Sequence, residues 1–182
     1  MPVAIILGFD AESTKVLNRV HRKLKESKFN SYYELVIPHI TLKSYDYIDL
    51  QVAKERLQQF CDDIDSFRIQ FSSFAYFPSE EGVVFLNPKT TVELLEIQQR
   101  ISELFEDFQA GNSPSEWIPH STLATDVPLN KIGEAIEIVK EDIKMEMEAP
   151  FYAEAQSIWT VEFKTGPISI ISTDEFKFKG AV

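Results

Sequence analysis

A six-residue pattern occurs twice in this chain and constrains its fold more than any other sequence feature. The pattern is Ile-Pro-His-x-Thr-Leu, and its two copies lie at residues 37–42 and 118–123, 81 residues apart. The 182 residues include three histidines, and two of them belong to this pattern. Because Pro, Thr and Leu are each a small share of an average protein, such framing of two histidines out of three is not accidental. The chain therefore contains an internal repeat.

The segments around the two copies also resemble each other. In each half, an apolar run typical of a buried strand and an amphipathic helix precede the pattern, and a second helix and a further strand follow it. In the second half, Thr90 with Glu93 is predicted to form the capping box of the first helix. A duplicated β-α-β-α-β unit is the simplest account of this order. We expect one domain over residues 1–182, with pseudo-repeat halves at approximately 1–82 and 83–182.

Each copy of the pattern is predicted to lie on a strand. Side chains alternate between the two faces of a strand, so His39 and Thr41 share one face, and His120 and Thr122 do the same. Each copy then presents an imidazole and a hydroxyl side by side, while the alternate residues face the core. If a pseudo-two-fold axis relates the halves, the four side chains meet across a cleft. The predicted strands run over residues 36–42 and 117–123.

Two imidazoles and two hydroxyls suit the cleavage of a phosphodiester. One neutral imidazole accepts a proton from the attacking water or ribose hydroxyl, and the other, protonated, donates one to the leaving oxygen. Histidine serves both roles near neutral pH because its ordinary pKa is about 6.5. Hydroxyl groups donate hydrogen bonds to the non-bridging oxygens, where negative charge builds. We therefore predict no metal or other cofactor, an acid–base pair and two phosphate-binding hydroxyls: His39, His120, Thr41 and Thr122.

Three further residues are predicted to contact the substrate. Lys43 follows the first pattern and shares the face of its histidine and threonine if the strand continues regularly. Tyr33 lies in the loop before the first pattern, where it either lines the cleft or faces solvent. Trp117 precedes the second pattern and could stack on a base, although packing in the core is favoured. His21 has no matching motif, and we expect it at the surface or boundary of a helix.

Composition excludes several classes of function. The formal net charge of -11 opposes binding to long duplex nucleic acid, for which affinity comes mainly from Lys and Arg. The single cysteine, Cys61, allows no internal disulfide and fits a reducing compartment. No apolar run approaches the roughly 20 residues that cross a bilayer. We expect a cytoplasmic protein, a monomer or weak oligomer, that binds no membrane.

The paired Pro-His-x-Thr-Leu motifs resemble those of the two-histidine (2H) phosphoesterase superfamily, which includes 2′-5′ RNA ligase-like proteins and cyclic phosphodiesterases. The resemblance extends from Ile5 to Thr173 and implies a bilobed α+β fold with antiparallel sheets around a central cleft. It implies a metal-independent phosphodiesterase acting on a cyclic or terminal phosphodiester of a nucleotide or short RNA. Many RNA ligase-like members carry a basic residue shortly after the second motif, whereas residues 123–126 contain none. This difference favours a small phosphodiester or an RNA terminus as the partner.

Three alternatives stay open on the sequence. The same site could act as a 2′-5′ RNA end ligase or hydrolase. The protein could bind a phosphorylated small molecule without turnover, although binding alone would tolerate Lys or Arg in place of the histidines. The motifs could also be packing relics, in which case both histidines would be buried and far apart.

Overall fold

The fold is given by a computed structural model of the chain. It describes residues 1–31, 35–78, 82–111, 116–140, 142–143, 150–165 and 168–181. Tyr33, one of the predicted substrate contacts, lies outside the described residues. The elements in chain order are β1 (Val3–Phe9), α1 (Ala11–Glu26), β2 (His39–Tyr45), α2 (Leu50–Asp62), β3 (Phe67–Phe77), β4 (Gly82–Pro88), α3 (Val92–Leu104), β5 (Ser121–Val127), the 3-10 turn η1 (Leu129–Lys131), α4 (Ile132–Lys140), β6 (Phe151–Lys164) and β7 (Ser169–Lys177).

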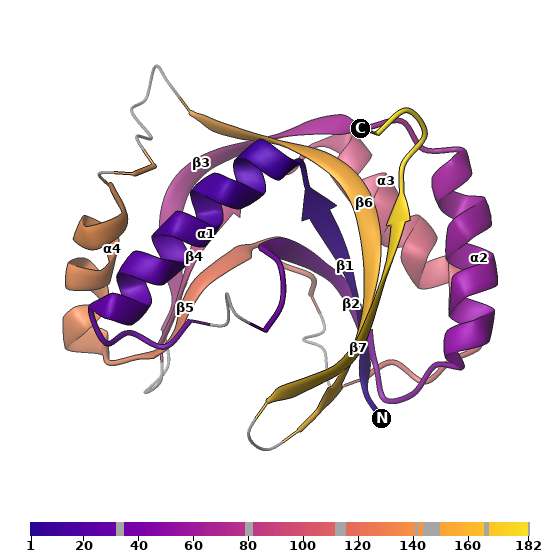
Figure 1. Cartoon of the computed structure of the whole chain (residues 1–182), viewed down its shortest axis with the longest axis horizontal. Coiled ribbons are helices and arrows are strands. Elements are labelled where there is room, and N and C mark those ends of the chain that lie inside the picture. Colours follow the sequence, from indigo (N-terminus) through magenta and orange to yellow (C-terminus); the bar gives the residue numbers. More distant parts are fainter. Residues whose placement is uncertain are drawn as a thin grey trace.

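The strands of the described chain form one antiparallel sheet in the order β2-β1-β6-β3-β4-β5, with β7 paired to β6. The long strand β6 joins the two parts of this sheet. Its first residues pair with β3, its last residues pair with β7, and β1 runs along its other edge. The sheet is strongly bent into an arch (Figure 1). The predicted α+β class with antiparallel strands is therefore confirmed.

The bend brings the two outermost strands together. Strands β2 and β5 end the sheet on opposite sides, yet they contact each other. The indole N–H of Trp117, just before β5, donates a hydrogen bond to the carbonyl oxygen of Thr41 in β2 (2.9 Å). Trp117 is partly buried against the core, as the packing interpretation predicted. Because β2 and β5 carry the two motifs, the curvature of one sheet places the motifs side by side.

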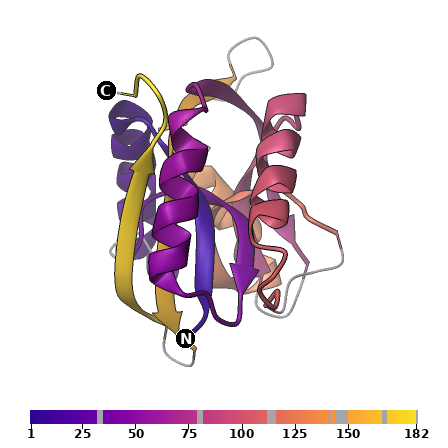
Figure 2. The ribbon, with the colours of Figure 1, turned by 90° about the vertical axis from the view of Figure 1, so that its right-hand side faces the viewer.

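Helices flank the arch on two sides, as Figures 1 and 2 show. Helices α1 and α4 pack against each other and against the β4–β5 part of the sheet, whereas α2 and α3 lie against β2, β6 and β7. Each flank thus combines one helix from the first half of the sequence with one from the second. Helices from the two predicted halves therefore pack side by side on each flank.

The observed starts of two strands and the cap of one helix differ from the predicted ones. Strands β2 and β5 begin at His39 and Ser121, later than predicted. Pro38 and Pro119 have no N–H group to pair across the sheet, so pairing starts only after them. The cap of α3 is Thr91, whose hydroxyl accepts from the Leu94 N–H (3.3 Å), so the predicted cap at Thr90 is one residue early.

Candidate active site

The two motif histidines are held in the same way. The Nδ1 atom of His39 lies 2.7 Å from the carbonyl oxygen of Ile37, and that of His120 lies 2.8 Å from the carbonyl oxygen of Ile118. A carbonyl oxygen only accepts, so Nδ1 carries the proton and donates it in both rings. The neutral form of each imidazole then has its lone pair on Nε2, directed away from its own backbone. Both rings are therefore prepared to accept a proton at Nε2.

Each motif strand also contains a β-bulge immediately after the threonine. The extra residue is Leu42 on β2 and Leu123 on β5, so the register shifts at the same motif position in both copies. A bulge leaves one residue without a partner and re-aims the side chains beyond it. The shared sequence pattern therefore has a bulge at the same position in both halves.

The first bulge moves Lys43 away from the site. Residues that pair directly across strands project to the same face, and Lys43 pairs with Ile5, which is fully buried in the core. The next residue, Ser44, pairs with Ala4 and lines a hollow together with the histidine and threonine of the first motif. The prediction that Lys43 shares their face is wrong, because it assumed regular alternation through a strand that is bulged.

Ser44 and Thr125 are site residues that the sequence analysis missed. Ser44 lines a hollow beside the first motif, and Thr125 lines a hollow beside the second. The two residues are 81 positions apart, like the motifs themselves. That shared offset was the signal that could have identified both, since each is a hydroxyl residue three positions after its motif threonine.

Two hollows adjoin at His39. The first, of about 130 Å³, lies between the motifs and is lined by His39, Thr122 and Thr125. The second, of about 240 Å³, is lined by His39, Thr41 and Ser44 together with apolar side chains. The first hollow brings a histidine of one motif and a threonine of the other to the same space. This arrangement does not match packing relics whose histidines are buried and far apart.

His120 occupies an aromatic setting that His39 lacks in the described structure. Its ring meets Phe77 edge to face, with centroids 5.0 Å apart, and lies 5.3 Å from Phe85. Both motif histidines are half-buried. Burial lowers the pKa of His39, the hydrogen bond to the Ile37 carbonyl opposes this, and positive charge on His120 lowers the pKa of His39 further. A proton on His120 therefore disfavours a second proton on His39.

Burial also lowers the pKa of His120, and the hydrogen bond to the Ile118 carbonyl opposes that shift. With both values below the ordinary value near 6.5, both imidazoles are mainly neutral at pH 7 before a ligand binds. The backbone carbonyl at each Nδ1 favours the protonated ring. The site can therefore hold one neutral and one protonated imidazole once an anion is present.

The third histidine lines the same hollow between the motifs. His21, on α1, is 5% exposed, and its Nδ1 lies 2.6 Å from the hydroxyl of Ser31. Burial and the nearby His39 lower the pKa of His21 to about 4, while the Leu123 backbone opposes the shift. The expected surface or boundary position is therefore wrong. The signal was its place four residues after Leu17, within the apolar stripe that α1 buries.

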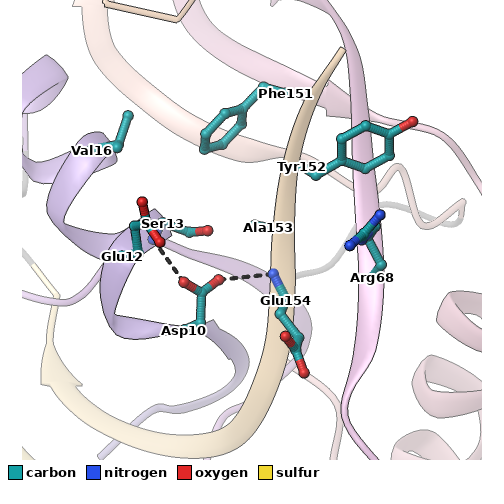
Figure 3. Close-up of a pocket in the computed structure, with 9 residues that line it drawn as sticks. All are labelled: Asp10, Glu12, Ser13, Val16, Arg68, Phe151, Tyr152, Ala153 and Glu154. Atoms are coloured by element: carbon teal, nitrogen blue, oxygen red, sulfur yellow. Dashed lines mark hydrogen bonds between the residues drawn. The ribbon is translucent and has the colours of Figure 1, made fainter. Parts of the chain in front are cut away.

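A larger hollow, of about 340 Å³, lies at the start of β6 and contains no motif residue (Figure 3). The two carboxylate oxygens of Asp10 accept from the N–H groups of Ser13 and Glu154, each at 2.9 Å. Burial raises the pKa of Asp10, but the hydrogen bonds outweigh it and hold that pKa below its usual value. Arg68 stacks over the ring of Tyr152, 5.2 Å from its centroid. The Asp10 hydrogen bonds cap α1 and tie it to β6, and the Arg68 contact joins β3 to β6, so these contacts have structural roles.

Neither a metal cluster nor a membrane span is found in the described ranges. Among those residues, no group of three or more His, Cys, Asp or Glu is arranged to hold a metal ion. The helices there are too short or too polar to cross a bilayer. The absence of a cofactor stays a prediction.

Comparisons with known sequences identify the family of this chain. The family model of the 2′-5′ RNA ligase superfamily matches residues 13–160. A candidate phosphoesterase of Staphylococcus haemolyticus (strain JCSC1435) is 26% identical over 145 residues, which cover 74% of this chain and 83% of the relative. A candidate phosphoesterase of Geobacillus sp. (strain WCH70) is 27% identical over 104 residues, 56% of this chain. That second match spans only 58% of the relative's length.

Solved structures share the fold at low sequence identity. The protein TT0787 of Thermus thermophilus has a TM-score of 0.68 and 14% identity, with 99% of each chain covered. E. coli LigT complexed with 3′-AMP has a TM-score of 0.59 and 11% identity, covering 97% of this chain and 99% of LigT. The family match extends over most of the sequence, including both motifs. This chain therefore belongs to the 2′-5′ RNA ligase superfamily, the two-histidine phosphoesterases that its paired motifs resemble.

Proposed function

We propose that the protein is a metal-independent phosphodiesterase that cleaves a cyclic or terminal phosphodiester of a nucleotide or short RNA. The observation that carries this proposal is the hollow shared by His39 of the first motif and Thr122 of the second. The matching Nδ1 hydrogen bonds of the two histidines support it, because they leave both Nε2 atoms available for proton transfer.

In the proposed reaction, the Nε2 atom of one imidazole takes the proton of the attacking water or ribose hydroxyl. The attacking oxygen forms a bond to phosphorus, and the bond from phosphorus to the leaving oxygen breaks. The second imidazole, protonated, gives its Nε2 proton to that leaving oxygen. Thr41 and Thr122 donate hydrogen bonds to the non-bridging oxygens as charge builds there. After this step the first imidazole is protonated and the second is neutral. Proton exchange with solvent returns both to their starting states.

The lining of the site favours a phosphate with a single negative charge. Neither Lys nor Arg is among the described residues that line the two hollows beside His39. A diester carries one charge, which neutral hydroxyls and one imidazolium can balance, whereas a terminal monoester carries nearly two at neutral pH. E. coli LigT, a structural neighbour, has been solved with 3′-AMP and with ATP. Small nucleotides are therefore the first substrates to test.

The test is hydrolysis of 2′,3′-cyclic mononucleotides in the presence of EDTA. We expect turnover by the wild type and a loss of about 10²–10⁴ in rate for His39→Asn and for His120→Asn. The matched control is Lys43→Ala, which removes a charge beside the first motif but on the other face of β2, and should retain turnover. Activity that survives in either histidine variant would refute the proposal.

The same preparation separates the alternatives. Joining or cleavage of 2′-5′ linked RNA ends, with no action on mononucleotides, would identify the RNA end ligase or hydrolase. Thermal stabilisation by diesters without any product would identify a non-catalytic binder of phosphorylated ligands. Loss of activity on addition of EDTA would exclude the metal-independent mechanism.

A further inference from the structure

The second hollow beside His39 is polar at one end and hydrocarbon elsewhere. Its polar groups, His39, Thr41 and Ser44, all belong to β2. The rest of its described wall consists of apolar side chains from β1, the segment before the first motif, and the β6–β7 hairpin, with Val161 and Ile170 among them. The lining of the hollow therefore changes from polar at β2 to apolar at β6 and β7.

The sheet register explains this change. Ser44 pairs with Ala4, and Ala4 pairs with Val161, so the three side chains form one row across β2, β1 and β6. Neighbouring strands lie about 4.8 Å apart, so the row extends about 10 Å from the hydroxyl of Ser44 to the apolar side chain on β6. A phosphate held at the β2 end would place its ester substituent over β1 and β6.

We propose that this hollow is a subsite for an uncharged, apolar group of the diester, chosen by its apolar surface and not by hydrogen bonds. The proposal rests on the proposed function, which places phosphorus beside His39 and Thr41. The hydrogen-bonding groups of the described wall lie at the phosphate end, so polar edges of a substituent would find no partner farther along. Burying polar groups without partners is unfavourable. Either a hydrocarbon chain or the flat face of a base has the required chemistry.

The first arm of the test measures binding without turnover. Isothermal titration calorimetry compares dimethyl phosphate with methyl n-hexyl phosphate, which differ only in chain length. We expect the hexyl ester to bind more tightly, by about fourfold for each methylene group that is buried. Equal affinities for the two esters, or no detectable binding of the hexyl ester at millimolar concentration, would overturn the subsite.

Two neighbouring isoleucines on β7 provide a matched pair of variants. Ile170 lines the hollow, whereas Ile171 is 44% exposed and does not line it. Ile170→Thr should reduce the advantage of the hexyl ester several-fold and leave the affinity for dimethyl phosphate unchanged. Ile171→Thr should leave both affinities unchanged. An equal effect of the two substitutions would contradict the assignment of the wall.

The second arm compares the four 2′,3′-cyclic mononucleotides. A subsite that reads apolar surface should accept all four with KM values within about tenfold, since a site that hydrogen-bonds its ligand discriminates far more strongly. A preference of about 100-fold for one base would overturn the proposal. Tighter binding of nucleotides than of the hexyl ester would identify a base face as the occupant, and the reverse would identify a hydrocarbon chain.

The failure of this proposal is distinguishable from that of the phosphodiesterase assignment. Chain-length-dependent binding with no hydrolysis of any diester would support the subsite and refute the catalytic function. Hydrolysis of cyclic nucleotides with no dependence of binding on chain length would refute the subsite and leave the catalytic function intact.

Discussion

Replacement of His21 by glutamine should make the protein more resistant to mild acid. The pKa of His21 is about 4 in the folded protein, against 6.5 for an ordinary histidine. Between those two pH values the unfolded chain binds a proton at this residue that the folded chain does not bind. The free energy of unfolding therefore falls as the pH falls through this window, and the full stability is present only above pH 6.5. One pKa unit corresponds to about 1.4 kcal/mol, so the loss reaches about 3 kcal/mol near pH 4.

The assay is urea unfolding of wild type and His21→Gln at intervals from about pH 7 to about pH 4. Taking the difference between the two proteins removes the contribution of the carboxylates, which both share. That difference should move by about 3 kcal/mol in favour of the variant as the pH falls. Ser31→Ala is the control, because it removes the hydrogen-bond partner at 2.6 Å but keeps the titrating ring, so its pH dependence should follow the wild type. Parallel curves for wild type and His21→Gln would refute the reasoning.

Three further predictions concern the site and its supports. Because both motif imidazoles have lowered pKa values, the kcat/KM of the proposed reaction should follow a bell-shaped pH profile with its maximum below about pH 6.5, and a steady-state profile that peaks above this value would contradict the burial argument. A Cβ atom at Gly8 would lie 2.8 Å from both Ser157 Oγ and Trp159 Nε1, so Gly8→Ala should lower the unfolding free energy by about 1–3 kcal/mol, as measured in urea. Trp117→Phe removes the 2.9 Å bond to the Thr41 carbonyl and should cost about 1 kcal/mol in the same assay, whereas an unchanged midpoint would mean that this bond adds nothing.

The features that the sequence predicts well are those encoded locally or by repetition. The alternation within each motif predicted that Ile40 and Leu42 face the core, and both are fully buried. The amphipathic helix expected before the first motif is present as α1, which buries Leu17, Val20 and Leu24, although His21 on the same face was expected at the surface or boundary. The late start of β2 was also encoded, since Pro38 stands directly before it, but the prediction gave more weight to the apolar run than to the missing N–H.

The face on which Lys43 lies could not be predicted from the residues around it. A bulge is a mismatch of length between two paired strands, so it depends on β1 as much as on β2. Strand pairing across some 30 residues of intervening chain leaves no mark in the six residues of the motif. The position of Ser44, by contrast, becomes visible when the repeat offset is applied beyond the motif. Comparing the two repeats can thus identify site residues that the alternation of side chains along one strand does not predict.

The six-residue motif can be understood as a self-contained unit for presenting an imidazole. The carbonyl of its isoleucine accepts the Nδ1 proton, which orients the ring and leaves Nε2 free. Its proline delays strand pairing until the histidine in the first copy and until Ser121 in the second. Its leucine is the unpaired residue of a bulge that also depends on the partner strand. The variable position is Ile40 in one copy and Ser121 in the other, and both are buried. Because this side chain points to the opposite face from the histidine, its identity can differ between the copies. Since each unit orients its own imidazole, the remaining requirement is to bring two units together. The bent sheet meets that requirement by placing its two edge strands in contact.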